Sequence, residues 1–398
     1  MTPESQIPIE ATQGRRFAVY LALFYSVSFA VLGTHLPFFT VWLKAVGIEP
    51  AWIGIISAVP AVTRFTTLPF VAGLAERRQA LRAALILTAF ASAIGFALVG
   101  TQHQPLPVLL LYIVTCCFWT PLLPLTDAYA LRGVARYKLD YGPLRLWGSV
   151  AFIAGALACG LLVDVIAARE LIWIIVALAA LTAFTGLSLQ PLDETRRKSA
   201  AAHGGKRLLR DASFLAIIAS AALIQSSHTA YYTFASINWQ AHGLGGLTIA
   251  GLWALGVFAE IIVFAVSPRL SLHPSLLVVI GGLSAVARWS ITAQDPPLAL
   301  LAIVQLGHGL SFGLTQVGVM NLLVRHVPAH QMARGQGYYA ATSGLLSSTT
   351  SIISGAIYAR YGEALYYLMA AMAGTGAMLM WTARYRLFAH PQSDASGG

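Results

Sequence analysis

The stretch LWALGVFAEIIVFAV, residues 252–266, is apolar except for one carboxylate, Glu260, near its middle. It belongs to a longer apolar run, about 247–267, that could cross ~30 Å of hydrocarbon as a helix. Glu260 would then lie near the bilayer midplane, where an ionised group is costly. The stretch therefore predicts a transmembrane helix with a carboxylate that needs a reason to be there.

Runs of this kind recur along the whole chain. Hydrophobic residues make up 57% of the sequence and charged residues only 10%, against roughly 25% charged in a soluble domain. The runs are continuously apolar rather than alternating, which excludes strands. We expect an all-α integral membrane protein with twelve transmembrane helices, at about 17–43, 51–74, 81–100, 107–130, 143–166, 170–190, 213–237, 247–267, 275–294, 297–322, 337–359 and 363–383.

The basic residues predict the topology. With both termini in the cytoplasm, nineteen of the 25 Lys and Arg residues flank the runs on the cytoplasmic side, three lie on the other side and three lie within runs. This asymmetry is the positive-inside rule. The formal net charge of +10 therefore reflects membrane insertion, and we do not expect a nucleic-acid partner.

One long hydrophilic connection, QPLDETRRKSAAAHGGKRLLRDAS, divides the runs into two sets of six. We predict a six-helix half at 1–189, a cytoplasmic linker at 190–212 and a second half at 213–398. Two six-helix halves are the plan of the major facilitator superfamily, whose halves rock about a midplane site. All three cysteines lie inside predicted spans, so we expect no disulfide, metal site or cofactor.

Three consecutive spans in the second half carry Glu260, Arg288 and His308. Glu260 could form a structural salt bridge with Arg288. Alternatively it carries a proton, because a carboxylate whose surroundings alternate can take up a proton on one side and release it on the other. His308 is then a candidate for proton relay, or simply a packed side chain among glycines.

The first half carries Asp127 and Arg145 close to its cytoplasmic face, and Arg64 deeper in the second span. Asp127 and Arg145 could be an interfacial pair that reaches water or a substrate clamp, since Arg grips carboxylates and paired hydroxyls with two donors. Arg64 could serve in helix packing or attract substrate. His228 and Tyr231, in the seventh span, are further candidates for substrate contact, although aromatic side chains in spans also serve packing.

Several segments resemble the 3-phenylpropionic acid permease family of the major facilitator superfamily. They are FFTVWLKAVGI (38–48), PLLPLTDA (121–128), LDYGPLRLWGSVAF (139–152), the long segment 226–270 that begins SSHTAYYTF, and AVARWSI (285–291). The resemblance covers nearly the whole chain. It implies a twelve-helix proton symporter that imports an aromatic acid.

The resemblance extends more distantly to lactose permease-type proton symporters. It implies that Asp127 and Arg145, with a matching separation of 18 residues, hold the substrate. Phe152 falls where those symporters have a Trp that stacks on the sugar. We therefore expect Phe152 to contact substrate as an aromatic ring without the indole.

In the second half, the resemblance implies a proton-coupling role for Glu260, Arg288 and His308. The carboxylate that carries the proton in lactose permease, three residues after the His, is replaced by Ser311 here. Glu260 would then take the proton role itself, or transport would not be coupled to protons.

We therefore expect proton-coupled uptake of a small aromatic carboxylate such as 3-phenylpropionate, by a monomer in the bacterial inner membrane. The alternative is proton symport of a sugar or nucleoside on the same fold. The sequence has no phosphate-binding loop and no catalytic His/Asp cluster, so neither an ATP-driven pump nor an enzyme is expected.

Overall fold

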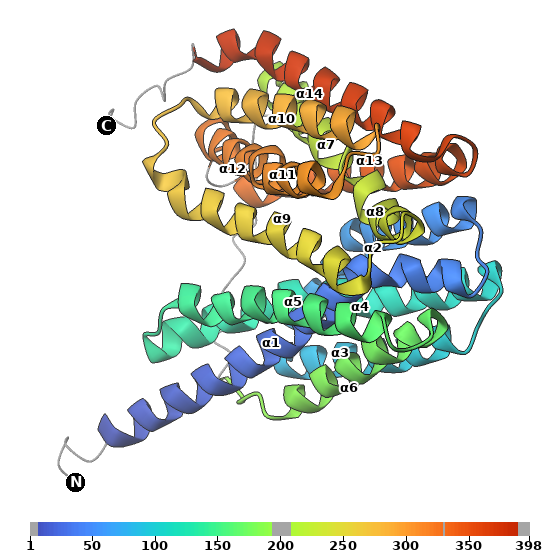
Figure 1. The fold of residues 1–398 in the computed structure, drawn as a ribbon. Coiled ribbons are helices and arrows are strands. Elements are labelled where there is room, and N and C mark those ends of the chain that lie inside the picture. Colours follow the sequence, from blue (N-terminus) through green and yellow to red (C-terminus); the bar gives the residue numbers. More distant parts are fainter. Residues whose placement is uncertain (1–6, 193–207, 329–330, 389–398) are drawn as a thin grey trace, which may run out of the picture. The chain divides into compact units, whose positions relative to one another are not determined.

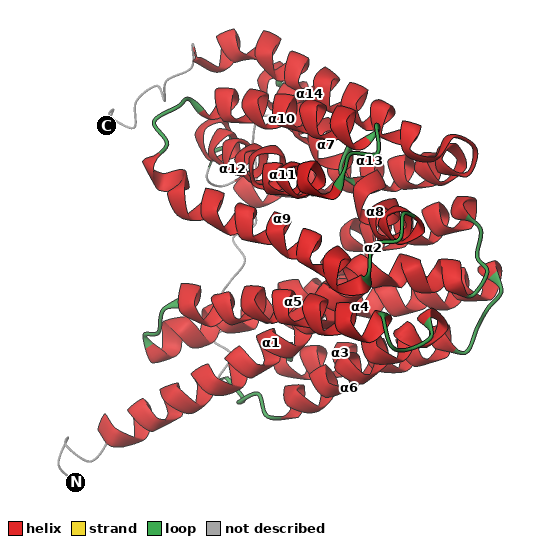
Figure 2. Ribbon diagram, viewed as in Figure 1, coloured by secondary structure: helices red, strands yellow, loops and turns green. Residues whose placement is uncertain are grey.

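The computed structural model describes residues 7–192, 208–328 and 331–388 (Figure 1). Helices and their connections make up the described chain, and it contains no strand (Figure 2). Most of the predicted linker, 190–212, lies outside the described residues.

Eleven stretches of the described chain are long and apolar enough to cross a membrane. The last of them, Arg334–Leu387, contains two helices, α13 (Met332–Tyr361) and α14 (Leu365–Phe388). The all-helical membrane fold predicted from the apolar runs is therefore confirmed. The first six helices are α1 (Ile7–Ala45), α2 (Pro50–Arg77), α3 (Leu81–Gly100), α4 (Pro105–Tyr137), α5 (Tyr141–Val163) and α6 (Leu171–Leu187). They are followed by α7 (Ala212–Ser226), α8 (Thr229–Ala241), α9 (Gly246–Val266), α10 (Pro274–Thr292), α11 (Leu298–His308) and α12 (Thr315–His326).

Two predicted spans are not uniform α-helices. The seventh is broken between α7 and α8, where the Ser227 hydroxyl donates to the carbonyl of Ile224 at 2.6 Å and the His228 ring contacts the same oxygen at 3.1 Å. Such side chains compete with the backbone for a helical carbonyl and bend or interrupt the helix. The tenth span contains a π-helical turn, Gly309–Leu314, between α11 and α12, a feature often found at functional sites.

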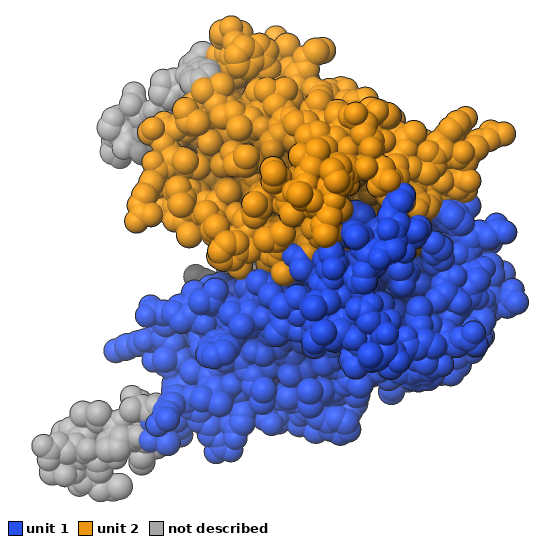
Figure 3. Space-filling view, viewed as in Figure 1, with its two compact units in different colours: residues 1–197, 239–251 blue, residues 198–238, 252–398 orange. Residues whose placement is uncertain are grey.

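The chain forms two compact units, coloured in Figure 3. Unit 1 comprises residues 1–197 and 239–251, and unit 2 comprises residues 198–238 and 252–398. In unit 1, α1 packs against α5 and α6, and α4 packs against α2 and α3. In unit 2, α10 packs against α12 and α14, and α7 packs against α13 and α14.

Within unit 1, the first residues of α9 are held by the end of α5. The Asp164 carboxylate, just after α5, accepts hydrogen bonds from the backbone N–H groups of Gly246 (2.7 Å) and Leu247 (3.4 Å). These are donors of the first turn of α9 that have no partner inside the helix. A Cβ at Gly160 would lie 2.6 Å from the Gly246 carbonyl oxygen, so the two backbones touch. Asp164 therefore caps a helix that is distant in sequence.

We expect Asp164→Ala to lower the free energy of unfolding by about 1 kcal/mol, because Ala leaves those N–H groups without a carboxylate. Asp164→Asn keeps an accepting oxygen and should lie between wild type and Asp164→Ala. Thermal denaturation of the three purified proteins in detergent measures the effect. An unchanged melting temperature in Asp164→Ala would contradict the capping role.

Candidate functional site

Asp127 on α4 is the centre of a polar cluster in unit 1. Its Oδ1 accepts hydrogen bonds from the hydroxyls of Tyr25 on α1 (2.6 Å) and Tyr141 on α5 (2.9 Å). The Nε of Arg145 lies 3.6 Å from the same oxygen. The three contacts join the first, fourth and fifth spans, and they place the predicted pair, Asp127 and Arg145, side by side.

Arg145 is held by aromatic faces as well as by charge. Its guanidinium carbon lies 4.1 Å from the centre of the Phe29 ring and 5.5 Å from that of Tyr25, within the range of cation–π attraction. The side chain of Arg145 is 29% exposed and that of Asp127 35%. Their charges are thus already paired with each other, and both groups remain accessible to a small molecule.

The other two candidates in unit 1 lie in different surroundings. Phe152 on α5 is buried, and its backbone lies directly against Gly33 of α1. Arg64 on α2 has an exposed side chain. Tyr25 and Tyr141 were not predicted. They lie 102 and 14 residues from Asp127, and neither separation indicates a contact between two helices.

In unit 2, Glu260 lies beside His308. The Oε2 of Glu260 is 3.9 Å from the Nε2 of His308. Glycine makes this approach possible: a Cβ at Gly309 would lie 2.5 Å from the backbone oxygen of Ala259. Ala259 precedes Glu260 and Gly309 follows His308, so this backbone contact brings α9 and the end of α11 together beside the two side chains. The Glu260 side chain is 24% exposed.

Arg288 on α10 occupies the interior of unit 2 and is 3% exposed. Its Nε donates to the carbonyl of Val304 at 2.9 Å. Its Nη1 donates to Ser311 Oγ at 2.7 Å and to His308 Nδ1 at 3.2 Å, and its Nη2 contacts Gln305 Oε1 at 3.5 Å. The alternative of a Glu260–Arg288 salt bridge is therefore not seen in this structure, in which Glu260 lies beside the His308 ring and Arg288 bonds to other groups.

These contacts define which ring nitrogens carry hydrogen. An Arg N–H can only donate, so His308 Nδ1 accepts, and the hydrogen of the neutral ring is on Nε2, toward Glu260. The Nδ1 of His228 lies 3.1 Å from the Ile224 carbonyl, which only accepts, so His228 Nε2 accepts from the Ser311 hydroxyl at 3.1 Å. A directed hydrogen-bond chain thus runs from Arg288 through Ser311 to His228.

His228 and Tyr231 are both buried next to this chain. His228 is 0% exposed, and its ring lies 5.4 Å from that of His308. The Tyr231 ring lies 4.7 Å from that of Trp253 and 5.9 Å from that of Trp289. The structure therefore brings five predicted residues of unit 2 into one cluster: His228, Tyr231, Glu260, Arg288 and His308.

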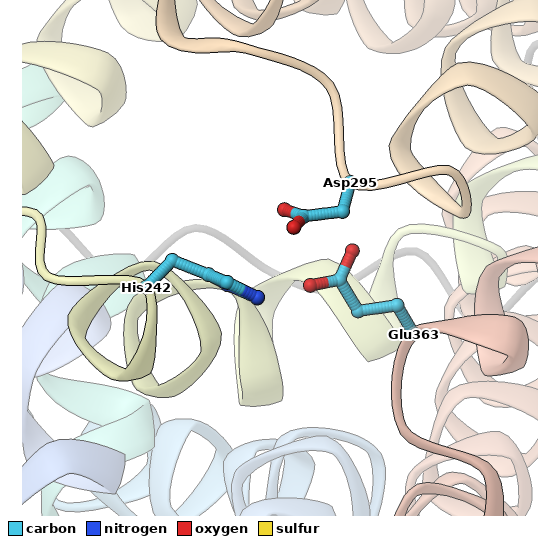
Figure 4. Close-up of side chains that lie close together, drawn as sticks. All are labelled: His242, Asp295 and Glu363. Carbon is cyan, nitrogen blue, oxygen red and sulfur yellow. The ribbon is translucent and has the colours of Figure 1, made fainter.

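Two further carboxylates of unit 2 approach each other outside this cluster. Carboxylate oxygens of Asp295 and Glu363 lie within 4.8 Å of each other, and the two groups are close together in Figure 4. Asn238 donates to Glu363, and Tyr358 donates to Asn238 at 3.1 Å. Figure 4 also labels His242, which belongs to unit 1. Since partly exposed acids often lie together without an ion, we assign no metal to them.

The family of the chain follows from a match to the model of the MFS_1 like family over residues 18–369. The chain belongs to this family of the major facilitator superfamily. It is also 31% identical over 365 residues to a protein of Escherichia coli (strain K12) described as a "Probable 3-phenylpropionic acid transporter", covering 89% of this chain and 94% of that protein.

Two other similarities agree with the family. The maltose permease of Geobacillus stearothermophilus is 27% identical over 358 residues, which cover 87% of this chain and 89% of that one. A crystal structure of a variant of the nucleoside transporter NupG matches with a TM-score of 0.84 at 14% identity, over 92% of this chain and 99% of that chain. This MFS_1-like protein is therefore a multi-pass membrane transporter of small molecules, and not an enzyme.

Proposed function

We propose that this transporter takes up a small aromatic carboxylate, such as 3-phenylpropionate, together with protons by alternating access. The observation that carries the proposal is the 31% identity to the "Probable 3-phenylpropionic acid transporter" over almost the full length of both proteins. The polar groups of both units fit this cargo, since each unit offers an Arg for a carboxylate and aromatic rings for a phenyl group.

In unit 1, Asp127 and Arg145 would contact the substrate, with Arg64 and Phe152 as additional contacts. The exposure of the Asp127–Arg145 pair supports this role, because a ligand can reach both groups. In unit 2, Tyr231 and His228 would contribute aromatic surface.

Proton coupling in this proposal depends on Glu260. It is supported by the position of Glu260 beside His308, whose other ring nitrogen accepts from Arg288. A proton taken up by Glu260 would change the charge beside the hydrogen-bonded His308 and Arg288 side chains, with no change in the backbone. We place the protein in the bacterial inner membrane as a monomer with both termini in the cytoplasm.

Uptake of labelled 3-phenylpropionate into proteoliposomes tests the proposal. We expect accumulation that requires an inward proton gradient and collapses with a protonophore. Protein-free liposomes measure passive entry of the protonated acid and provide the baseline. Uptake no faster than this baseline would overturn the proposed substrate.

A sugar or a nucleoside is the second candidate, because the maltose permease is 27% identical. Labelled maltose and uridine in the same proteoliposomes separate the two cases. Proton-driven uptake of either compound, without uptake of 3-phenylpropionate, would favour the alternative.

A further inference from the structure

Arg288 is a buried cation with neutral partners. Its four hydrogen-bond partners are a backbone carbonyl, an amide oxygen, a hydroxyl and a neutral imidazole. Among the described residues it forms no ion pair. A buried charge without a counter-charge destabilises the fold, so its retention points to a function.

We infer that Arg288 binds the carboxylate of the transported substrate. The inference rests on the aromatic carboxylate proposed above, and it assigns the cargo's charge to one group. Arg145, the other buried or half-buried Arg of the candidate site, already has the carboxylate of Asp127 at 3.6 Å. Arg288 is the one whose positive charge an anionic ligand would neutralise.

The hydrogen bonds of Arg288 leave donor capacity for such a ligand. Nη1 uses both of its hydrogens on neutral acceptors, His308 Nδ1 and Ser311 Oγ. Nη2 has two hydrogens and one partner, Gln305, at the long distance of 3.5 Å. A carboxylate could replace the neutral acceptors with two charge-assisted hydrogen bonds across Nη1 and Nη2, which are about twice as strong as neutral ones.

His308 is the side chain that must yield. Its ring lies between Glu260 on one nitrogen and Arg288 on the other, and next to it the Phe312 ring (5.3 Å) is only half-buried. A rotation of the His308 ring would release Nη1 of Arg288 and open it toward the more exposed groups, Glu260 and Phe312. Both ends of His308 are held by single polar contacts, so the rotation breaks few bonds.

Aromatic rings around Arg288 suit the remainder of the ligand. Its guanidinium carbon lies 4.5 Å from the centre of the Trp289 ring and 5.6 Å from that of Tyr231. The half-buried Tyr232 and Phe312 stand next to His308, with ring centres 6.3 and 5.3 Å from it. A phenyl group attached by a short chain to the bound carboxylate could pack on the half-buried rings of Tyr232 and Phe312.

The charges also account for a serine, and not a carboxylate, at position 311. With Glu260 ionised, Arg288 and Glu260 sum to zero. A bound substrate anion makes the sum minus one, and a proton on Glu260 restores zero. A second protein carboxylate at Ser311 would compete with the substrate for Arg288.

Binding to purified protein in lipid nanodiscs tests the inference, with 3-phenylpropionate and its neutral amide, 3-phenylpropionamide, as probes. For wild type we expect the acid to bind more tightly than the amide. Arg288→Gln should weaken acid binding by about tenfold or more, as expected for loss of a charge-assisted pair, and leave the amide unchanged. The acid affinity of Arg288→Lys should lie between those of wild type and Arg288→Gln, because Lys keeps the charge but lacks the planar guanidinium fork.

Arg269→Gln is the matched control, since Arg269 is an exposed basic residue in the short 3₁₀ turn after α9. This variant should bind the acid like wild type. Equal acid affinity in wild type and Arg288→Gln would overturn the inference and leave the proposed substrate standing. No acid binding by wild type would overturn both. Should Arg288→Gln fail to fold, an unchanged acid affinity in Arg288→Lys overturns the inference, and a weakened one supports it.

Discussion

Glu260→Gln is expected to abolish proton-driven accumulation of substrate while substrate exchange continues. Gln has nearly the same shape and can still contact His308, but it cannot take up a proton. A gradient of one pH unit is worth about 1.4 kcal/mol per proton, which can sustain a roughly tenfold substrate gradient. In Glu260→Gln the internal substrate concentration should instead rise only until it equals the external concentration.

Two assays in the same proteoliposomes measure this. Uptake driven by a pH gradient reports coupling, and counterflow without a gradient reports binding and alternation of the carrier. Glu49→Gln is the control, because Glu49 is exposed in the connection before α2 and should behave as wild type in both assays. Accumulation by Glu260→Gln at the wild-type level would remove Glu260 from the coupling mechanism.

Gly33→Ala is expected to destabilise unit 1 strongly. A Cβ at Gly33 would overlap the backbone carbonyl of Phe152 on α5, and a Cβ at Gly155 of α5 would lie 2.9 Å from the Cα of Ala30. The clash is with backbone, so no side-chain rotation can relieve it and the two helices must separate. We expect the free energy of unfolding to fall by about 3 kcal/mol, at the upper end of the usual cost of overpacking. A lower melting temperature in detergent would show this.

Gly73→Ala provides the comparison. Gly73 lies inside α2 and a Cβ there would meet nothing within 4 Å, so Ala should raise stability by about 0.5–1 kcal/mol through its helix preference. If Gly33→Ala melted at the temperature of Gly73→Ala, the close contact of α1 and α5 would not contribute to stability.

The membrane fold was predictable because each span must satisfy its own backbone and expose apolar side chains to lipid. That requirement is visible in short stretches of sequence, as uninterrupted apolar runs with basic residues between them. Local deviations were not predictable. The break before α8 arises when Ser227 and His228 share the carbonyl of Ile224, and such competition depends on rotamers that composition does not report.

For the candidate site, the sequence indicated which helices carry charge but not how each helix is rotated. Glu260, Arg288 and His308 do lie together, yet the expected alternative of a direct Glu260–Arg288 pair is replaced by His308 between them. The hydroxyl of Ser311 was noted only as the loss of a carboxylate. In the structure it contacts both Arg288 and His228. His228 lies 83 positions before Ser311, a separation at which no periodicity predicts a contact.

The π-helical turn at Gly309–Leu314 gives the tenth span a property that a regular helix lacks. A π turn contains about one residue more than an α turn, so the segment holds spare length directly after His308. Tightening to α geometry would swivel the following residues by about 100° about the helix axis, while each amide keeps a carbonyl to bond. In this way α12 could rotate while α11 stays in place, and the span would not have to unwind in lipid.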